Sequence, residues 1–170
     1  MKKYLLTLAK YNRDADKKVA QVFDAMSEEE RQRDRKAYFK SFHDTLDHLA
    51  SSGIFWQNTI RSVHPDFPCF SQNYFNMQFE RGKTSFPEYS ELKKTVFNLD
   101  DNWIEIINKL SDEELETPFI FKTPYGEMNV SPIMVILRHI NHCTHHRGQI
   151  SQILDELKIE NDFSKIEKYE

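Results

Sequence analysis

The chain has 170 residues, a formal net charge of −4, 39% hydrophobic residues and 29% charged residues. This length fits a single domain spanning residues 1–170 with a sizeable core, and the composition excludes a disordered chain. The acidic balance argues against nucleic acid as a partner, and no apolar run approaches the roughly 18 residues of a membrane span. With only 4 Gly and 6 Pro, the chain has few turn residues, which favours long helices over a β-sandwich.

The cysteine count and the N-terminus indicate a cytoplasmic protein. Cys69 and Cys143 are too few for a disulfide framework, and their spacing is not that of a redox pair or a zinc knuckle. The first ten residues combine two lysines with a short apolar run, but no small-residue cleavage site follows. We therefore expect no signal peptide.

The first helix is predicted from apolar residues that recur at steps of three and four between Leu5 and Met26. Asn12 is a polar member of this stripe, and it either lines a central pocket or sets the helix register, as buried Asn does in coiled coils. Ser27 and Glu30 have capping-box spacing, which predicts a short polar helix that ends before Tyr38.

The second helix is predicted to begin at Ser41, and its stripe runs from Phe42 to Ile60 with His48 at its edge. Gly53 lies within this stripe and weakens the helix unless another group packs closely against it. Residues 61–84 contain two prolines and five aromatic residues, and we expect a long connection with a short helix around Tyr74. Connections of this length often shape a binding site.

The second half of the chain predicts two more long helices separated by a β-hairpin. The segment Ser85-Phe86-Pro87-Glu88 combines a cap, a first-turn proline and an acidic residue, and a stripe follows over residues 92–110. Residues 111–115 resemble a short capped turn. Two β-favouring runs flank a Pro-Tyr-Gly turn in residues 118–130.

The last helix is predicted over residues 133–157, after the cap and first-turn proline of Ser131-Pro132. Together these elements predict an all-α four-helix bundle. It has a long crossover between its second and third helices and a small β-hairpin before its last helix.

Histidines give the strongest local signal, because four of the seven fall between positions 139 and 146. His142 and His146 are four residues apart and share a helix face, which is the geometry with which two imidazoles chelate a divalent metal. His48 is the best candidate for a third ligand. Three imidazoles without a fourth protein ligand leave an open position, as catalytic sites do. This ligand set favours a divalent transition metal, zinc or nickel first, over magnesium or calcium.

The alternative is that His142 and His146 are core histidines whose hydrogen bonds are satisfied. His139 lies three residues before His142 and is either an alternative ligand or a pocket wall. His145 points away from the ligand line, so it supports the ligands or lies at the surface. His43 and His64 follow no pattern and are expected at the surface.

Four further residues have two readings each. Asp44, four residues before His48, either orients the ring of that histidine or only caps the helix. Trp56 is a candidate pocket wall, although a core position is the more common one. Arg147 binds an anionic group or pairs with a carboxylate. Cys143 is read as a small apolar residue and not as a nucleophile.

These residues resemble the DinB/YfiT-like family of bacterial metal-binding four-helix proteins. The matching segments are residues 9–12 with Ala15, residues 41–56, and residues 139–150, which read HINHCTHHRGQI. The resemblance covers nearly the whole chain. It implies a bundle with a long crossover, a metal held by His48, His142 and His146, and frequent homodimers. Related proteins include bacillithiol and mycothiol S-transferases and a mycothiol-dependent maleylpyruvate isomerase.

The leading functional hypothesis is a metal-dependent transferase that activates a low-molecular-weight thiol for attack on a small electrophile. One divalent metal per chain would take the thiol sulfur in its open position and lower the thiol pKa. One alternative is a hydrolase in which the metal activates water, which is less favoured because residues 143–145, between the paired histidines, include no carboxylate. The other is a non-catalytic metal-binding stress-response protein or a dimeric interaction module.

Overall fold

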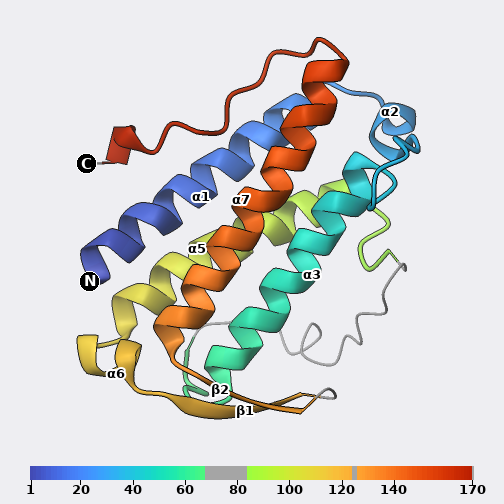
Figure 1. Ribbon diagram of the computed structural model, residues 1–170. Coiled ribbons are helices and arrows are strands. Elements are labelled where there is room, and N and C mark those ends of the chain that lie inside the picture. The colour runs from blue at the N-terminus through green and yellow to red at the C-terminus, as the bar shows by residue number, and fades with distance from the viewer. Residues whose placement is uncertain (68–83, 124–125, 170) are drawn as a thin grey trace.

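A computed structural model describes residues 1–67, 84–123 and 126–169 of the chain (Figure 1). In these ranges the four long helices are α1 (Lys2–Asp24), α3 (Phe42–Arg61), α5 (Tyr89–Lys109) and α7 (Pro132–Glu156). The short elements are α2 (Glu28–Gln32), α6 (Asp112–Glu116), β1 (Phe119–Thr123), β2 (Gly126–Val130) and the 3-10 helix η1 (Glu167–Tyr169). Helices α1 and α3 each pack against both α5 and α7. The predicted all-α bundle is confirmed.

The small hairpin before the last helix is also confirmed. Strand β1 pairs antiparallel with β2 in a register that sets Phe119 opposite Val130 and Thr123 opposite Gly126. The first two residues of the predicted Pro-Tyr-Gly turn lie outside the described residues, as does the helix expected around Tyr74. Most of the long crossover between α3 and α5 lies outside them as well.

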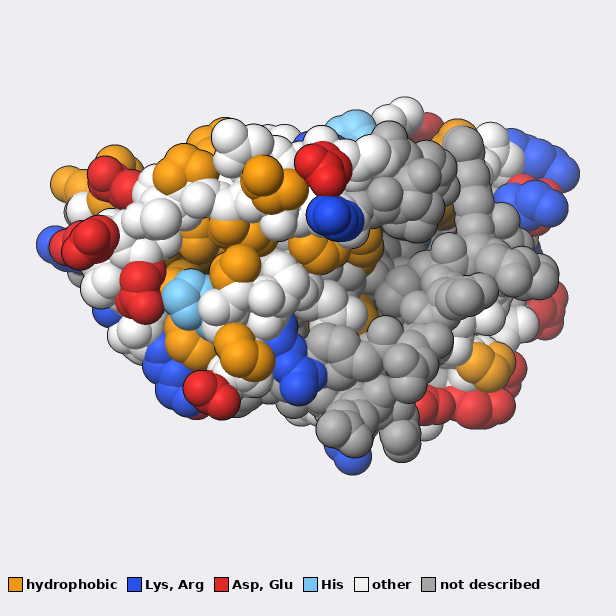
Figure 2. All heavy atoms as spheres, turned by 90° about the horizontal axis from the view of Figure 1, so that it is seen from below, with side chains coloured by type: hydrophobic (Ala, Val, Ile, Leu, Met, Phe, Trp, Pro, Cys, Tyr) orange, Lys and Arg blue, Asp and Glu red, His pale blue; other side chains and the backbone are white. Residues whose placement is uncertain are grey.

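The end of the bundle that carries α6 and the hairpin has a mixed surface. Seen from this end, hydrophobic side chains show between charged ones, and acidic and basic groups are scattered over the face (Figure 2). Ile120 on β1 and Met134 at the start of α7 are among the exposed hydrophobic residues. None of the helices in the described ranges is long and apolar enough to cross a membrane.

Serine caps begin three of the helices, as the sequence predicts. The hydroxyl of Ser41 accepts a hydrogen bond from the backbone N–H of Asp44 (3.0 Å), and Ser27 caps α2 in the same way. Ser111 forms a complete capping box with Glu114 at the start of α6. Each cap satisfies an N–H group that has no partner inside its helix.

The predicted start of the third long helix at Ser85 is wrong, because α5 begins at Tyr89. The carboxylate of Asp47 on α3 accepts hydrogen bonds from the backbone N–H groups of Ser85 (2.9 Å) and Phe86 (2.7 Å). These two amides are therefore held by a neighbouring helix, and the chain stays non-helical as far as Glu88.

The interior contains two separate apolar clusters, one toward each end of the bundle. The first includes Phe23, Phe42 and Leu92, and the second includes Ile60, Ile107 and Ile136. On α1, α5 and α7 a layer of buried polar residues falls between the two clusters. Its members are Asn12, Asp16, Asp100, His146 and Arg147.

Gly53 allows α3 to pack closely against two other helices. A Cβ atom at this position would lie 3.1 Å from Cδ1 of Leu99 on α5 and 3.3 Å from Cε1 of His139 on α7. The close packing anticipated for this glycine is therefore present, and it offsets the weak helix propensity of glycine.

Candidate metal centre

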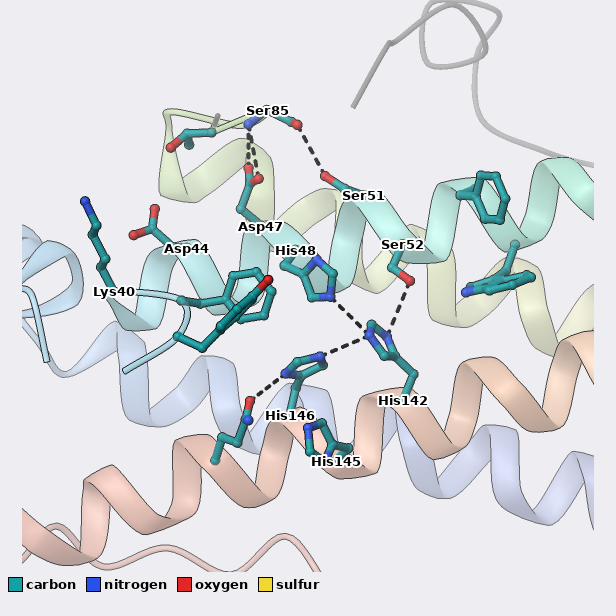
Figure 3. A pocket seen from close by; sticks show the side chains of 16 residues that line it. Lys40, Asp44, Asp47, His48, Ser51, Ser52, Ser85, His142, His145 and His146 are labelled. Carbon is teal, nitrogen blue, oxygen red and sulfur yellow. Dashed lines mark hydrogen bonds between the residues drawn. The ribbon is translucent and has the colours of Figure 1, made fainter. Parts of the chain in front are cut away.

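Three histidines from two helices meet beside the middle of the bundle. His142 and His146 lie one turn apart on α7, and His48 on α3 faces them (Figure 3). The Nε2 atom of His142 lies 3.1 Å from Nε2 of His48 and 3.0 Å from Nε2 of His146. The three rings offer nitrogen atoms that all lie within 4.8 Å of one another.

This spacing fits a metal ion with imidazole ligands. Two nitrogen ligands of a tetrahedral zinc ion lie about 3.3 Å apart when their bonds have the usual length. Within the described ranges, no cysteine or carboxylate joins the group. The three histidines could therefore hold a divalent ion while leaving part of its coordination sphere open.

Burial keeps the three imidazoles neutral. Burial, with a smaller contribution from the charge of neighbouring imidazoles, lowers the pKa of His48 and of His142 to about 4. The pKa of His146 is also lowered, mainly by burial. A neutral imidazole is the form that binds a metal, so at neutral pH the group is ready for an ion.

Hydrogen bonds hold two of the three rings in place. Oε1 of Gln149 lies 2.7 Å from Nδ1 of His146, and Oγ of Ser52 lies 3.4 Å from Nδ1 of His142. A proton on each Nδ1 leaves Nε2 free to bind the ion, which is how supporting groups orient histidine ligands. Sequence reasoning assigned neither supporting role. Helical spacing was the signal that could have indicated these roles. Gln149 follows His146 by three residues, and Ser52 follows His48 by four, which places it on the helix face that carries His48.

Asp44 lies at the start of α3, on the other side of His48 from Ser52. Its backbone N–H donates to the cap Ser41, and Figure 3 shows its carboxylate directed away from the His48 ring. Within the described residues no hydrogen bond joins Asp44 to His48. Asp44 thus takes part in the helix cap and lines the neighbouring cavity.

A cavity of about 1040 Å³ opens next to the three histidines. This is the size of a site for a small organic molecule. Aromatic, hydroxyl and charged side chains line it, and they include Phe39, Lys40, Asp44, Ser51, Ser52, Phe55, Trp56, His145 and Gln149. Trp56 lines this cavity and is also a buried member of the second apolar cluster, so its side chain has a core position as well.

The comparison with protein families agrees with this geometry. The model of the DinB family matches residues 1–158. The chain belongs to the DinB family. The match includes all four long helices and all three histidines of the candidate centre. No curated protein matches the chain.

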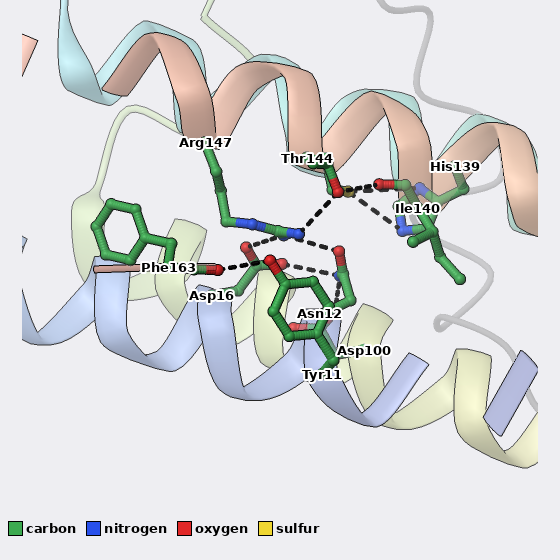
Figure 4. A network of polar contacts seen from close by, with 10 residues as sticks. Tyr11, Asn12, Asp16, Asp100, His139, Ile140, Thr144, Arg147 and Phe163 are labelled. Carbon is green, nitrogen blue, oxygen red and sulfur yellow. Dashed lines mark hydrogen bonds and ion pairs between the residues drawn. The ribbon is translucent and has the colours of Figure 1, made fainter. Parts of the chain in front are cut away.

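Two predicted pocket residues of this DinB-family chain lie in the bundle interior. Asn12 is 2% exposed and belongs to a polar network, in which its amide donates to Asp16 (3.0 Å) and Asp100 (2.9 Å) (Figure 4). His139 is buried, and its ring stacks on that of Trp103 with centroids 4.8 Å apart. Neither Asn12 nor His139 is among the described residues that line the cavity.

The carboxylate-paired reading of Arg147 is confirmed. Its Nη1 lies 2.9 Å from Oδ1 of Asp16 and 2.7 Å from Oδ1 of Asn12 (Figure 4). Cys143 is buried, and burial raises the pKa of its thiol well above the usual value. A thiol that stays protonated fits the reading of Cys143 as an apolar residue.

The surface prediction for His43 is wrong. Its side chain is buried, and Nε2 lies 2.8 Å from the backbone oxygen of Phe86. His64 is also more enclosed than expected, because its ring stacks on Phe67 with centroids 4.6 Å apart. In both cases the contact is made by a segment that follows α3, which the pattern of α3 itself cannot reveal.

Proposed function

We propose that this DinB-family protein is a metal-dependent transferase that activates a low-molecular-weight thiol for attack on a small electrophile. The observation that carries the proposal is the convergence of three neutral imidazoles beside a cavity large enough for an organic substrate. His48, His142 and His146 would hold the ion, for which zinc and nickel are the first candidates. A bound divalent ion would supply a Lewis acid that lowers the pKa of a thiol next to it.

The cavity walls support a division of roles between the two reactants. Phe55 and Trp56 offer apolar surface for the carbon framework of an electrophile and exclude water from it. Lys40 and Asp44 line the same cavity and carry charges that suit a polar thiol. In the reaction, the thiol proton leaves to water and the sulfur forms a bond to carbon. The leaving group departs with the electron pair of the broken bond.

Two other functions fit the cavity less well. A hydrolase would need a carboxylate beside the ion to take a proton from water. The Asp47 carboxylate in the lining is engaged by the amides of Ser85 and Phe86, and the Asp44 carboxylate is directed away from the His48 ring (Figure 3). A non-catalytic metal-binding stress protein needs no large cavity beside its metal. The proposal includes a homodimer and a cytoplasmic location, which rest on the family resemblance and on the cysteine usage.

Metal content tests the proposal first. Elemental analysis of the purified protein should find about one zinc, nickel or similar ion per chain. A variant with both His142→Ala and His146→Ala should lose it, because one imidazole cannot hold the ion alone. His64→Ala is the matched control, since this histidine stacks on Phe67 and lies outside the group of three. A wild-type protein that takes up no metal when supplied with it would overturn the proposal.

Activity is the second step of the same test. The metal-loaded protein should conjugate at least one low-molecular-weight thiol to a member of a broad electrophile panel, and the double variant should not. A protein that binds metal but conjugates nothing would contradict the transferase reaction and leave the metal site standing.

A further inference from the structure

The three histidines are not supported in the same way. Nδ1 of His142 faces Ser52, and Nδ1 of His146 faces Gln149. In the part of the chain that the structure describes, no hydrogen bond reaches Nδ1 of His48. Because histidine ligands almost always have such a partner, another contact must fix the orientation of this ring.

Phe39 supplies that contact. Its ring stacks on the ring of His48, with centroids 4.2 Å apart and an angle of 20° between the planes. The same phenyl ring meets His146 edge to face, with centroids 5.4 Å apart. Phe39 also lines the cavity. It therefore touches one ligand from each of the two helices and forms a wall next to both.

The segment that carries Phe39 is itself held in place. The backbone N–H of Arg35 donates to the carbonyl oxygen of Lys40 (2.6 Å), which closes the chain into a turn around Phe39. The guanidinium of Arg35 also binds the carboxylate of Glu30 on α2 (2.6 Å). Ser41 then caps α3. The phenyl ring is thus presented to His48 by a short loop anchored at both ends.

We propose that Phe39 is a positioning residue of the metal centre. It fixes the ring plane of His48 by stacking, where the other two ligands use hydrogen bonds, and it closes one side of the centre to incoming ligands. This inference rests on the proposed metal site and does not depend on the transferase reaction. A thiol or other donor would then approach the ion from the side of the cavity away from Phe39.

Cobalt(II) binding tests the positioning role, with Co²⁺ as the metal probe. The variant Phe39→Ala should bind Co²⁺ roughly tenfold more weakly or worse, as losses of supporting partners typically do. Its visible Co²⁺ spectrum should also change, because the His48 ring is free to tilt. Phe39→Tyr keeps the stacking ring and should retain the affinity and the spectrum of the wild type.

The matched control is Phe55→Ala, which removes a phenyl ring from another wall of the same cavity. Ring contacts of Phe55 are made with Trp56 and Phe121, so Co²⁺ binding should not change. Circular dichroism should show that each variant is folded. If Phe39→Ala binds Co²⁺ with the affinity and spectrum of the wild type, the positioning role is wrong although the metal site stands. If the wild type binds no Co²⁺, both proposals are overturned.

A measurement on the metal-free protein separates stacking from coordination. The ring protons of His48 should shift in the NMR spectrum when Phe39 is replaced by Ala, because a stacked phenyl ring shields them. The ring protons of His142 should move much less. Unchanged His48 signals would mean that the stack does not form in solution, and the inference would fail. If the protein passes the Co²⁺ and NMR tests but transfers no thiol, the positioning role of Phe39 still holds and only the transferase reaction is contradicted.

Discussion

Arg147 and Asp16 form a buried ion pair behind the candidate metal centre. Their side chains are 2% and 5% exposed, and Asn12 bonds to both of them. A lone charge in such a place would be costly, so each group depends on the other. This explains why the first stripe contains an asparagine, and why the residue after His146 points into the bundle and not into the cavity.

Replacement of Arg147 by Met should destabilise the protein strongly. The change leaves the Asp16 carboxylate buried without a cation, which typically costs about 3–5 kcal/mol. Urea unfolding of the metal-free protein measures the free energy of unfolding. Adding Asp16→Leu to this variant should recover part of the loss, because the unpaired charge is gone. Losses that simply add in the double variant would contradict the pairing.

Stability should depend on pH through His139. Burial lowers the pKa of this imidazole to about 3, whereas the unfolded chain has an ordinary value near 6.5. Between these values the unfolded state takes up a proton that the folded state does not. The contribution of neutral His139 to the free energy of unfolding is therefore fully present above about pH 6.5. It decreases as the pH drops toward 3, by up to about 1.4 kcal/mol per pH unit.

The variant His139→Phe isolates this effect. Urea unfolding of both metal-free proteins at about pH 7.5 and about pH 5 should show a smaller loss in the variant. The ligand histidines titrate in both proteins, so their contribution cancels in the comparison. Equal losses in the two proteins would exclude His139 as a source of acid sensitivity.

Sequence spacing predicts the three converging histidines but not the groups around them. The helical period places His142 and His146 on the same face of one helix. His48 is a candidate because it lies at the edge of the apolar stripe of the second helix. Asp44 and Ser52 both lie four residues from His48, and only the packing of α3 on α7 brings Ser52, and not Asp44, to a ligand ring. The role of Phe39 has no periodic signal at all, because it lies in a loop.

At the scale of elements, local signals succeed when both partners are close in sequence. The caps at Ser27, Ser41 and Ser111 each bond to an amide three residues later, and all three helices begin where predicted. Ser85 has the same local pattern, but no helix begins there. Its backbone N–H donates to the carboxylate of Asp47, which lies 38 residues away in the sequence. The start of α5 is therefore decided by tertiary structure.

At the scale of the whole molecule, the candidate ligands join distant parts of the chain. His48 and His142 are 94 residues apart in sequence, and they belong to the neighbouring helices α3 and α7. A bound ion would link these helices in the folded state, and the unfolded chain would have to close a long loop to bind it in the same way. Metal binding is therefore expected to stabilise the fold.

Thermal melting should reveal this coupling. Zinc should raise the melting temperature and a chelator should lower it, because a ligand that binds only the folded state stabilises by about 2.7 kcal/mol at 100 times its Kd. The melting temperature of the His142→Ala, His146→Ala double variant should not respond to either reagent. Differential scanning calorimetry on both proteins provides the comparison. A zinc response that persists in the double variant would place the stabilising ion elsewhere.

The polar layer between the two apolar clusters also separates the hydrophobic packing at one end of the bundle from that at the other. Substitutions deep in opposite clusters, such as at Phe23 and Ile107, share no cluster members, so we expect their effects on the free energy of unfolding to add. We therefore expect that a conservative change of packing at one end of the bundle alters the packing of the opposite end little.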